Sequence, residues 1–193
     1  TKDTVMYGAS LTKTVFAFTV MQLVDQHRFN LDKPIQADLD RPLTSYGADP
    51  AIRHKYGPYQ DLAGDPRWRQ ISPRMCLTHS TGFNNFWFFE PDRKLRIHFK
   101  PGSRFSYSGE GFVLLQFAIE HGRKAQGLGL DVGSLTNAVF LRLGMTRSAI
   151  SRSLPRLNSS SVAPAAQDKG GTYLGGICDR NTLAPAPITL PVV

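Results

Sequence analysis

The segment 10–27 constrains the fold most, because it predicts a helix that is apolar on most of its sides. Its apolar residues are Val15, Phe16, Phe18, Val20, Met21, Leu23 and Val24. A helix that is apolar all round is normally buried, so we expect this one to lie inside the domain. The polar residues Asp25, Gln26 and His27 end it.

Two further substantial helices are expected, over 110–126 and over 131–143, with Gly144 closing the second. A shorter helix is predicted to begin at Ser72, which would act as the N-cap, with the following Pro at the first helical position. We expect Gly82 to end that helix as a left-handed cap.

Two segments lack a sustained periodicity of hydrophobic residues. Residues 34–70 are rich in Pro, Gly, Asp and Arg, and they predict a long, mostly irregular connection of the kind that often forms the wall or lid of a site. Residues 151–193 are rich in Ser, Ala, Pro and Gly, with weak β signals around 172–178, and predict a divergent, poorly ordered tail. The chain therefore divides into a domain over 1–150 and a tail over 151–193.

Composition and charge exclude several classes of function. With 41% hydrophobic and 20% charged residues in a length of 193, the chain can bury a core. Its net charge is +8, but the 23 Lys and Arg are scattered and form no nucleic-acid-binding motif, so no nucleic-acid partner is expected. No apolar run is long enough to predict an integral membrane segment. Cys76 and Cys178 lie outside metal-binding spacings, and we expect neither a metal nor a cofactor.

Ser10 and Lys13 form a Ser-x-x-Lys pair at the start of the apolar helix. Residues three apart share one face of a helix and can reach each other. A serine hydroxyl needs a neighbouring base to become a nucleophile, and a partly desolvated Lys can act as that base or lower the pKa of a nearby Tyr. An N-cap Ser followed by a solvent-facing Lys would give the same pattern. The position of the pair at the start of a buried helix favours the catalytic interpretation.

The residues around Ser10 distinguish among classes of serine enzyme. Residues 8–12 read G-A-S-L-T, which is not the G-x-S-x-G of an α/β-hydrolase nucleophile elbow. None of the five histidines belongs to a motif that would complete a Ser-His-Asp triad. One of them, His79, is interpreted as structural.

Four segments, in order along the chain, resemble the serine β-lactamase and penicillin-binding-protein superfamily, and most closely its class C β-lactamase-like branch of esterases and peptidases. They are YGASLTKTVFAFTVMQLVDQHRFNLDKPI, MCLTHSTGF, FKPGSRFSYSGEGFVLLQFAIE and FLRLGMTRS. The last three resemble the branch's LLTHTSG, PGxxFxYSNxGYxLLGxIIE and PLGMxxT segments. The resemblance spans about residues 4–150.

The resemblance implies roles for three residues. Ser10 would be the acylated nucleophile, Lys13 its partner, and Tyr107 the general base or proton shuttle. The alternative for Tyr107 is a packed aromatic beside a Pro-Gly turn. The backbone N–H of Ser10 would supply half of an oxyanion hole. The implied activity is hydrolysis of a small-molecule or peptide-like acyl substrate (an ester, an amide or a β-lactam) through an acyl-enzyme.

The sequence departs from the family at two places. Gly109 stands where the family has an Asn that helps to hold the substrate amide and the Lys, which favours an esterase-like hydrolase over a dedicated β-lactamase. The third family motif, Lys or His-x-Gly on a strand, has no counterpart, because the KGG of residues 169–171 is too close in sequence to Tyr107. We therefore expect an α+β fold represented by its helical lobe and nucleophile helix, with an incomplete sheet, in a partial chain. A catalytically inactive fragment or binding module is the alternative.

An aromatic block over 83–90 supplies the remaining candidates. Phe86 and Trp87, with Gly109, are candidate substrate-binding residues, and a hydrophobic plug under a long loop is the alternative. Glu110 and Glu120, on the helix expected over 110–126, are expected at the surface. No signal peptide is visible, so a periplasmic or secreted location is suggested by the resemblance alone. The oligomeric state is not predicted.

Overall fold

The computed structural model of the chain describes residues 9–123, 131–146 and 148–150. Within these residues the regular secondary structure is helical and no strand is found. The α-helices are α1 (Thr12–Asp25), α2 (Leu43–Tyr46), α3 (Pro50–Lys55), α4 (Pro73–Leu77), α5 (Gly109–His121) and α6 (Val132–Arg142). The 3-10 helices are η1 (Ala9–Leu11), η2 (Ile35–Asp38), η3 (Tyr59–Leu62), η4 (Pro66–Gln70) and η5 (Trp87–Phe89).

The three long helices predicted from the sequence are confirmed as α1, α5 and α6. The second of them ends at His121, so the expected end at residue 126 is too late. The expected tail over 151–193, the KGG of residues 169–171 and Cys178 lie outside the described residues.

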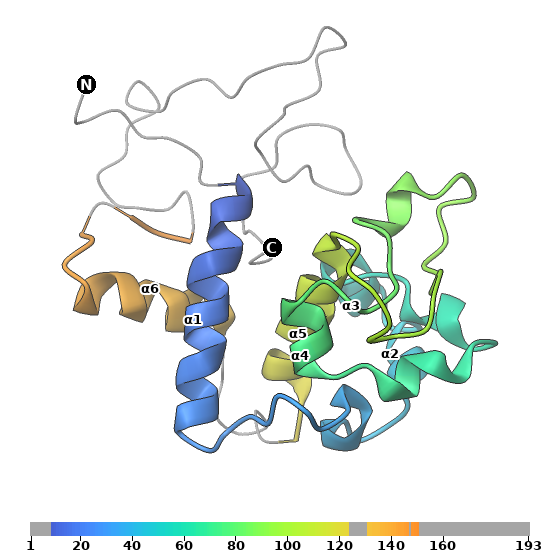
Figure 1. The fold of residues 1–193 in the computed structure, drawn as a ribbon, viewed down its shortest axis with the longest axis horizontal. Helices are drawn as coiled ribbons and strands as arrows, with labels where there is room; N and C mark the ends of the chain where they lie inside the picture. Colours follow the sequence, from blue (N-terminus) through green and yellow to red (C-terminus); the bar gives the residue numbers. More distant parts are fainter. Residues whose placement is uncertain (1–8, 124–130, 147, 151–193) are drawn as a thin grey trace, which may run out of the picture.

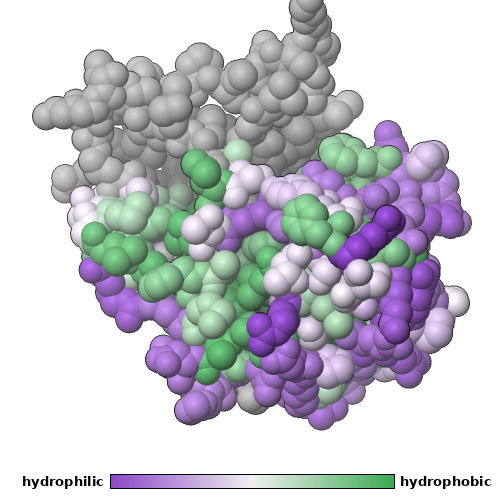
Figure 2. All heavy atoms as spheres, in the orientation of Figure 1, coloured by the Kyte–Doolittle hydropathy of each residue, from purple (hydrophilic) through white to green (hydrophobic). Residues whose placement is uncertain are grey.

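Helix α1 is buried on one face only, which corrects the expectation that it would be buried on most of its sides. Phe16, Val20 and Leu23 are in the core, whereas Phe18 and Met21 are 50% and 45% exposed. The reason is that α1 packs against α6, which crosses it in Figure 1, and that its Phe16 contacts Phe112 of α5, with ring centroids 5.7 Å apart. Figure 2 shows the consequence: apolar residues gather over α1 and α6, while the short helices on the other side of this view are mainly polar at the surface.

Helix α5 is the centre of the core, since every residue from Gly109 to Ile119 is buried. Its Phe117 is met edge-on by the rings of Tyr46, Tyr56 and Tyr59, with centroid distances of 5.0, 5.3 and 5.1 Å. These tyrosines come from the segment 34–70, for which we expected a mostly irregular connection. That expectation is wrong, because its short helices and 3-10 turns deliver separated aromatic and aliphatic side chains to α5.

Helix α4 begins as predicted and ends earlier than predicted. Ser72 is its N-cap and accepts a hydrogen bond from the backbone N–H of Met75. The helix stops at Leu77, and the first left-handed residue after it is His79, with φ 55°. Gly82 also has a positive φ, of 92°, but it lies in the following loop and does not cap the helix.

Glu110 on α5 is buried and Glu120 is partly buried, with a side chain only 6% exposed, so the expectation that both lie at the surface is wrong. Glu110 is 1% exposed. Glu120 accepts hydrogen bonds from Lys55 at 2.7 Å, from the backbone N–H of Val132 at 3.1 Å and from the hydroxyl of Tyr56. Burial and the Glu120 carboxylate both raise the pKa of Tyr56. These contacts join α3, α5 and the start of α6 around one carboxylate.

Cys76 on α4 is fully buried, and burial raises the pKa of its thiol. Across the described ranges, none of the helices combines the length and the apolar character needed to cross a membrane. The described residues also contain no cluster of three or more His, Cys, Asp and Glu side chains arranged to hold a metal ion.

Candidate active site

Ser10 and Lys13 lie at the N-terminal end of α1, where the 3-10 turn η1 leads into the helix. Ser10 is exposed, whereas Lys13 is only 8% exposed. The ammonium Nζ of Lys13 donates a hydrogen bond to Ser10 Oγ at 3.2 Å, as the spacing of three residues predicted. Lys13 is therefore a buried cation directed at an accessible hydroxyl.

Tyr107 reaches the same hydroxyl from a segment 97 residues away in sequence, immediately before α5. Its phenolic OH donates a hydrogen bond to Ser10 Oγ at 2.8 Å. The Nζ of Lys13 also lies 4.9 Å from the centroid of the Tyr107 ring and 5.6 Å from that of Phe112. The structure thus brings together Ser10, Lys13 and Tyr107, the three residues singled out from the sequence as catalytic. The role of each stays a prediction.

The surroundings of Tyr107 favour loss of its proton. Desolvation raises the pKa of the phenol, but hydrogen bonds with Lys13 and Ser10, together with the positive charge of Lys13, outweigh it, and the net pKa is lowered. A phenol whose pKa is lowered is a better general base near neutral pH. Because both partners are hydroxyls, the contact lets Ser10 donate once Tyr107 is ionised.

His79 packs directly against Tyr107, with ring centroids 4.4 Å apart. It also contacts the rings of Phe112 at 5.1 Å and Phe105 at 5.6 Å. Desolvation lowers the pKa of His79, the hydrogen bond with the Ser108 backbone raises it, and the charge of Lys13 lowers it again, so the net pKa is lowered. From the sequence we interpreted His79 as merely structural. Its place in the MCLTHSTGF segment of the family resemblance was the signal that pointed to this site.

The aromatic loop, which we define as residues 84–90, is attached to the N-terminal end of α5. The Oγ of Ser108 donates to the carbonyl of Asn84 at 3.0 Å, and the backbone N–H of Gly109 donates to Asn85 Oδ1 at 2.9 Å. The N–H of Glu110 donates to the carbonyl of Asn85 at 2.9 Å, and its carboxylate accepts from the N–H of Trp87 at 3.1 Å. The loop is therefore held next to Tyr107 by residues 108–110.

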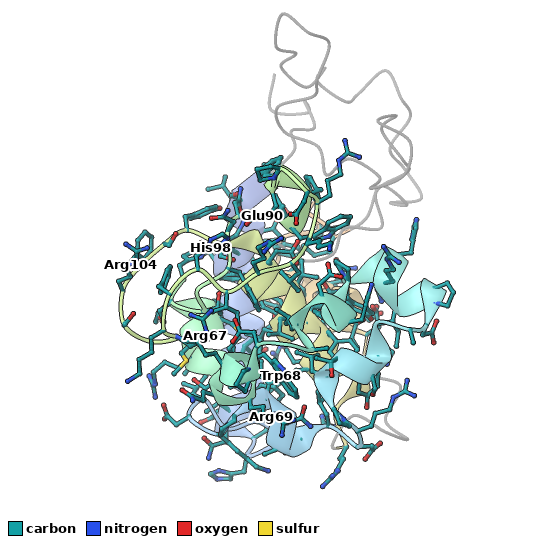
Figure 3. The ribbon with its side chains drawn as sticks, turned by 90° about the vertical axis from the view of Figure 1, so that its right-hand side faces the viewer. Arg67, Trp68, Arg69, Glu90, His98 and Arg104 are labelled. Carbon is teal, nitrogen blue, oxygen red and sulfur yellow. The ribbon has the colours of Figure 1, made fainter. Side chains whose placement is uncertain are left out.

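The far end of the aromatic loop is held by a second carboxylate. Glu90, which is buried, accepts hydrogen bonds from Asn84 at 2.6 Å and from His98 at 2.5 Å. Figure 3 shows Glu90 and His98 close together at the upper end of the described part of the chain. The loop is thus closed on itself by the contact between Asn84 and Glu90, and tied to the following segment through His98.

Phe86 and Gly109, two of the three candidate substrate-binding residues, are in direct contact. A Cβ placed on Gly109 would lie 2.7 and 2.8 Å from ring atoms of Phe86, so the ring fills the space that a side chain at 109 would need. The Phe86 ring stacks on Phe88 at 5.0 Å with an interplanar angle of 9°. Trp87, the third candidate, is partly buried and is packed against the core. An apolar wall therefore stands where the resemblance implies an amide side chain.

The arrangement of Ser10, Lys13 and Tyr107 around one hydroxyl oxygen agrees with the resemblance to the serine β-lactamase and penicillin-binding-protein superfamily. The chain belongs to the Beta-lactamase family, whose sequence model, described as Beta-lactamase, matches residues 1–170. Membership of this family indicates serine hydrolase-type activity in general.

Solved structures share the fold at low sequence identity. The penicillin binding protein from Bacillus halodurans matches with a TM-score of 0.58 and 22% identity, over 88% of this chain and 49% of that one. The D-amino acid amidase from Ochrobactrum anthropi SV3 gives 0.60 and 19%, over 88% and 45%. The octameric penicillin-binding protein homologue from Pyrococcus abyssi gives 0.55 and 23%, over 86% and 37%. The chain thus spans less than half the length of each of these proteins.

Among curated proteins, the chain is similar to one named for fimbrial assembly, FimD of serogroup D from Dichelobacter nodosus. The two are 26% identical over 141 residues, which is 64% of this chain and 31% of that protein. FimD of serogroup H1 from the same organism matches over the same shares. The chain therefore spans about a third of the length of the curated relatives it matches.

Proposed function

We propose that this chain carries the nucleophile of a serine hydrolase that acts through an acyl-enzyme on Ser10. The observation that supports the proposal is the convergence on Ser10 Oγ of the Tyr107 hydroxyl at 2.8 Å and the Lys13 ammonium at 3.2 Å. A positioned base and a neighbouring cation are what a serine hydroxyl needs in order to attack a carbonyl carbon.

In the proposed reaction, ionised Tyr107 takes the proton of the Ser10 hydroxyl as Oγ bonds to the carbonyl carbon. The backbone N–H of Ser10 donates to the oxyanion that forms. When the tetrahedral species collapses, the leaving alcohol or amine takes the proton from Tyr107, and the acyl group stays on Ser10. Water then attacks the ester carbonyl carbon and gives a proton to Tyr107. As the second tetrahedral species collapses, Tyr107 returns that proton to Ser10 Oγ, which releases the acid and restores both Ser10 and the phenolate. Lys13 supplies positive charge beside the phenolate throughout.

We further propose that the acyl group is held by Gly109, Phe86 and Trp87, and that esters are favoured over peptide-like amides. Gly109 offers no side-chain amide to a substrate, and Phe86 fills the space beside it with an apolar ring. An apolar wall binds an aliphatic or aromatic acyl group by removing its surface from water. It leaves the N–H of a peptide-like substrate without a partner, which disfavours that substrate.

The test is covalent labelling of the purified chain with a fluorophosphonate and with a fluorescent penicillin. We expect an adduct on Ser10, located by mass spectrometry of the digested protein, that is lost in Ser10→Ala. Ser45→Ala, which removes an exposed hydroxyl on α2, serves as the matched control and should label as the wild type does. A folded wild-type chain that forms no adduct with either probe would overturn the proposal and leave the inactive module as the interpretation. An adduct with the fluorophosphonate alone would support the preference for esters.

A further inference from the structure

We propose that His79 is a positioning residue for Tyr107, holding the phenol in the one place from which it reaches Ser10. The inference rests on the proposed function, because it concerns the base of that reaction. It assigns to His79 a role that the family resemblance does not supply.

His79 contacts three consecutive residues of the segment that carries the phenol. Its main-chain carbonyl accepts a hydrogen bond from the N–H of Ser106 at 2.8 Å. Its ring nitrogen Nδ1 accepts one from the N–H of Ser108 at 3.0 Å. Between these two anchors, its ring packs on the ring of Tyr107, with centroids 4.4 Å apart and an interplanar angle of 30°. The side chain and the backbone carbonyl of His79 therefore fix the backbone on both sides of Tyr107 and one face of its ring.

The ring stays attached to Ser108 whichever tautomer it adopts. Nδ1 lies 3.0 Å from the N–H of Ser108 and 3.2 Å from its carbonyl oxygen. An unprotonated Nδ1 accepts from the N–H, and a protonated one donates to the carbonyl. The hydrogen bond that orients the segment is thus preserved in both cases.

The backbone of His79 is in a conformation that disfavours histidine relative to glycine or asparagine. Its φ is 55°, in the left-handed region directly after α4. Glycine and asparagine take up this region more readily. Of these, only asparagine could also hydrogen-bond to Ser108, and neither offers a ring to pack on Tyr107. The contacts of the His79 ring with Ser108 and Tyr107 offset the conformational cost of its left-handed backbone.

Lys13, the charged group that α1 directs at the site, is a second neighbour of the Tyr107 ring. Its Nζ is 4.9 Å from the centroid of the Tyr107 ring and 5.6 Å from that of Phe112, which His79 also contacts. The phenol is thus in contact with both a cation from α1 and an imidazole from the loop after α4. A change that frees the imidazole should let the phenol move away from both Lys13 and Ser10.

The test compares His79→Phe, which keeps a ring and removes the side-chain hydrogen bond with Ser108, with His79→Asn, which keeps hydrogen-bonding groups and suits the left-handed backbone. We expect His79→Phe to slow labelling of Ser10 at saturating fluorophosphonate by about tenfold or more, as a loss of orientation does. The probe concentration at half-saturation should stay the same. His79→Asn should stay within about threefold of the wild type.

A second readout does not depend on activity. The ultraviolet titration of the phenols, with Tyr107→Phe subtracted to isolate Tyr107, should show a lowered pKa in the wild type and in His79→Asn. It should show a higher pKa in His79→Phe. The matched controls are His27→Phe and His27→Asn, because His27 is also left-handed, with φ 56°, and lies at the opposite end of α1 from Ser10.

The proposal is overturned if His79→Phe leaves both the labelling rate and the Tyr107 titration unchanged, or if His79→Asn is as impaired as His79→Phe. If His79→Phe does not fold, His79→Ala takes its place, since it also removes the side-chain hydrogen bond with Ser108. A wild type that forms no adduct contradicts the proposed function only, and the titration of Tyr107 then decides the role of His79.

Discussion

Gly109 is the residue at which the site departs from the family pattern, and the structure gives the departure a physical reason. The ring of Phe86 occupies the space beside the Cα of Gly109, and the carbonyl of Asn85 would lie 3.1 Å from any Cβ there. Gly109 and Phe86 therefore form a matched pair: a larger residue at 109 requires a smaller one at 86 or a shifted loop.

We expect Gly109→Ala to lower the free energy of unfolding by about 1–3 kcal/mol, because the added methyl overpacks a filled space. The reaction of Ser10 with the fluorophosphonate should slow as well. Adding Phe86→Leu should restore at least half of the lost stability, which a double-mutant cycle by urea denaturation measures. Gly64→Ala is the control, because a Cβ there meets nothing within 4 Å. Equal effects of Gly109→Ala and Gly64→Ala would contradict the steric account.

At the scale of elements, the long periodic helices and the order of the motifs were predictable, and the partners of buried polar groups were not. The apolar segment 10–27 and the capped segment 131–143 carry local signals, so α1 and α6 were recognised. Glu110 and Glu120 carry no such signal, because contacts distant in sequence help to bury them. Trp87 lies 23 residues from Glu110, and Tyr56 lies 64 residues from Glu120. The packing of 34–70 was missed for the same reason, since its apolar residues are spaced too irregularly to show a period.

The attachment of the aromatic loop to α5 gives a prediction at this scale. We expect Glu110→Ala to lower the free energy of unfolding by about 1–3 kcal/mol, because the N–H of Trp87 loses its acceptor. The loop should also become more sensitive to proteolysis. Glu110→Gln keeps an acceptor oxygen and should lose less. The measurements are urea denaturation and mass spectrometry of early chymotryptic cuts within 84–90. Identical behaviour of the two variants would show that the hydrogen bond does not hold the loop.

At the scale of the whole molecule, two partly buried histidines make stability depend on pH. Desolvation is the main cause that lowers the pKa of both His79 and His121. The unfolded chain therefore takes up protons at these positions at a higher pH than the folded chain does. The contribution of these two histidines to the free energy of unfolding is complete above about pH 6.5, the ordinary pKa of histidine. It is lost as the pH falls through their lower pKa values in the folded chain.

We expect the thermal midpoint, measured by circular dichroism, to fall first between about pH 6.5 and 5. A second fall should come near pH 4 and below, where carboxyl groups such as Asp65 are protonated; its hydrogen bond with Arg67 lowers the pKa of Asp65. His121→Gln should make the first fall smaller, whereas His27→Gln, at an exposed position, should not. A midpoint that stays constant from pH 7 to 5 would contradict this linkage.

The attachment of the aromatic loop has a consequence for how such a site can be altered. The loop is fixed through the backbone carbonyls of Asn84 and Asn85, the backbone N–H of Trp87 and the side chain of Asn85. None of these bonds uses the side chains of Phe86, Phe88 or Phe89. Substitutions at those three positions can therefore change the apolar surface of the aromatic loop while its backbone keeps its course beside residues 108–110.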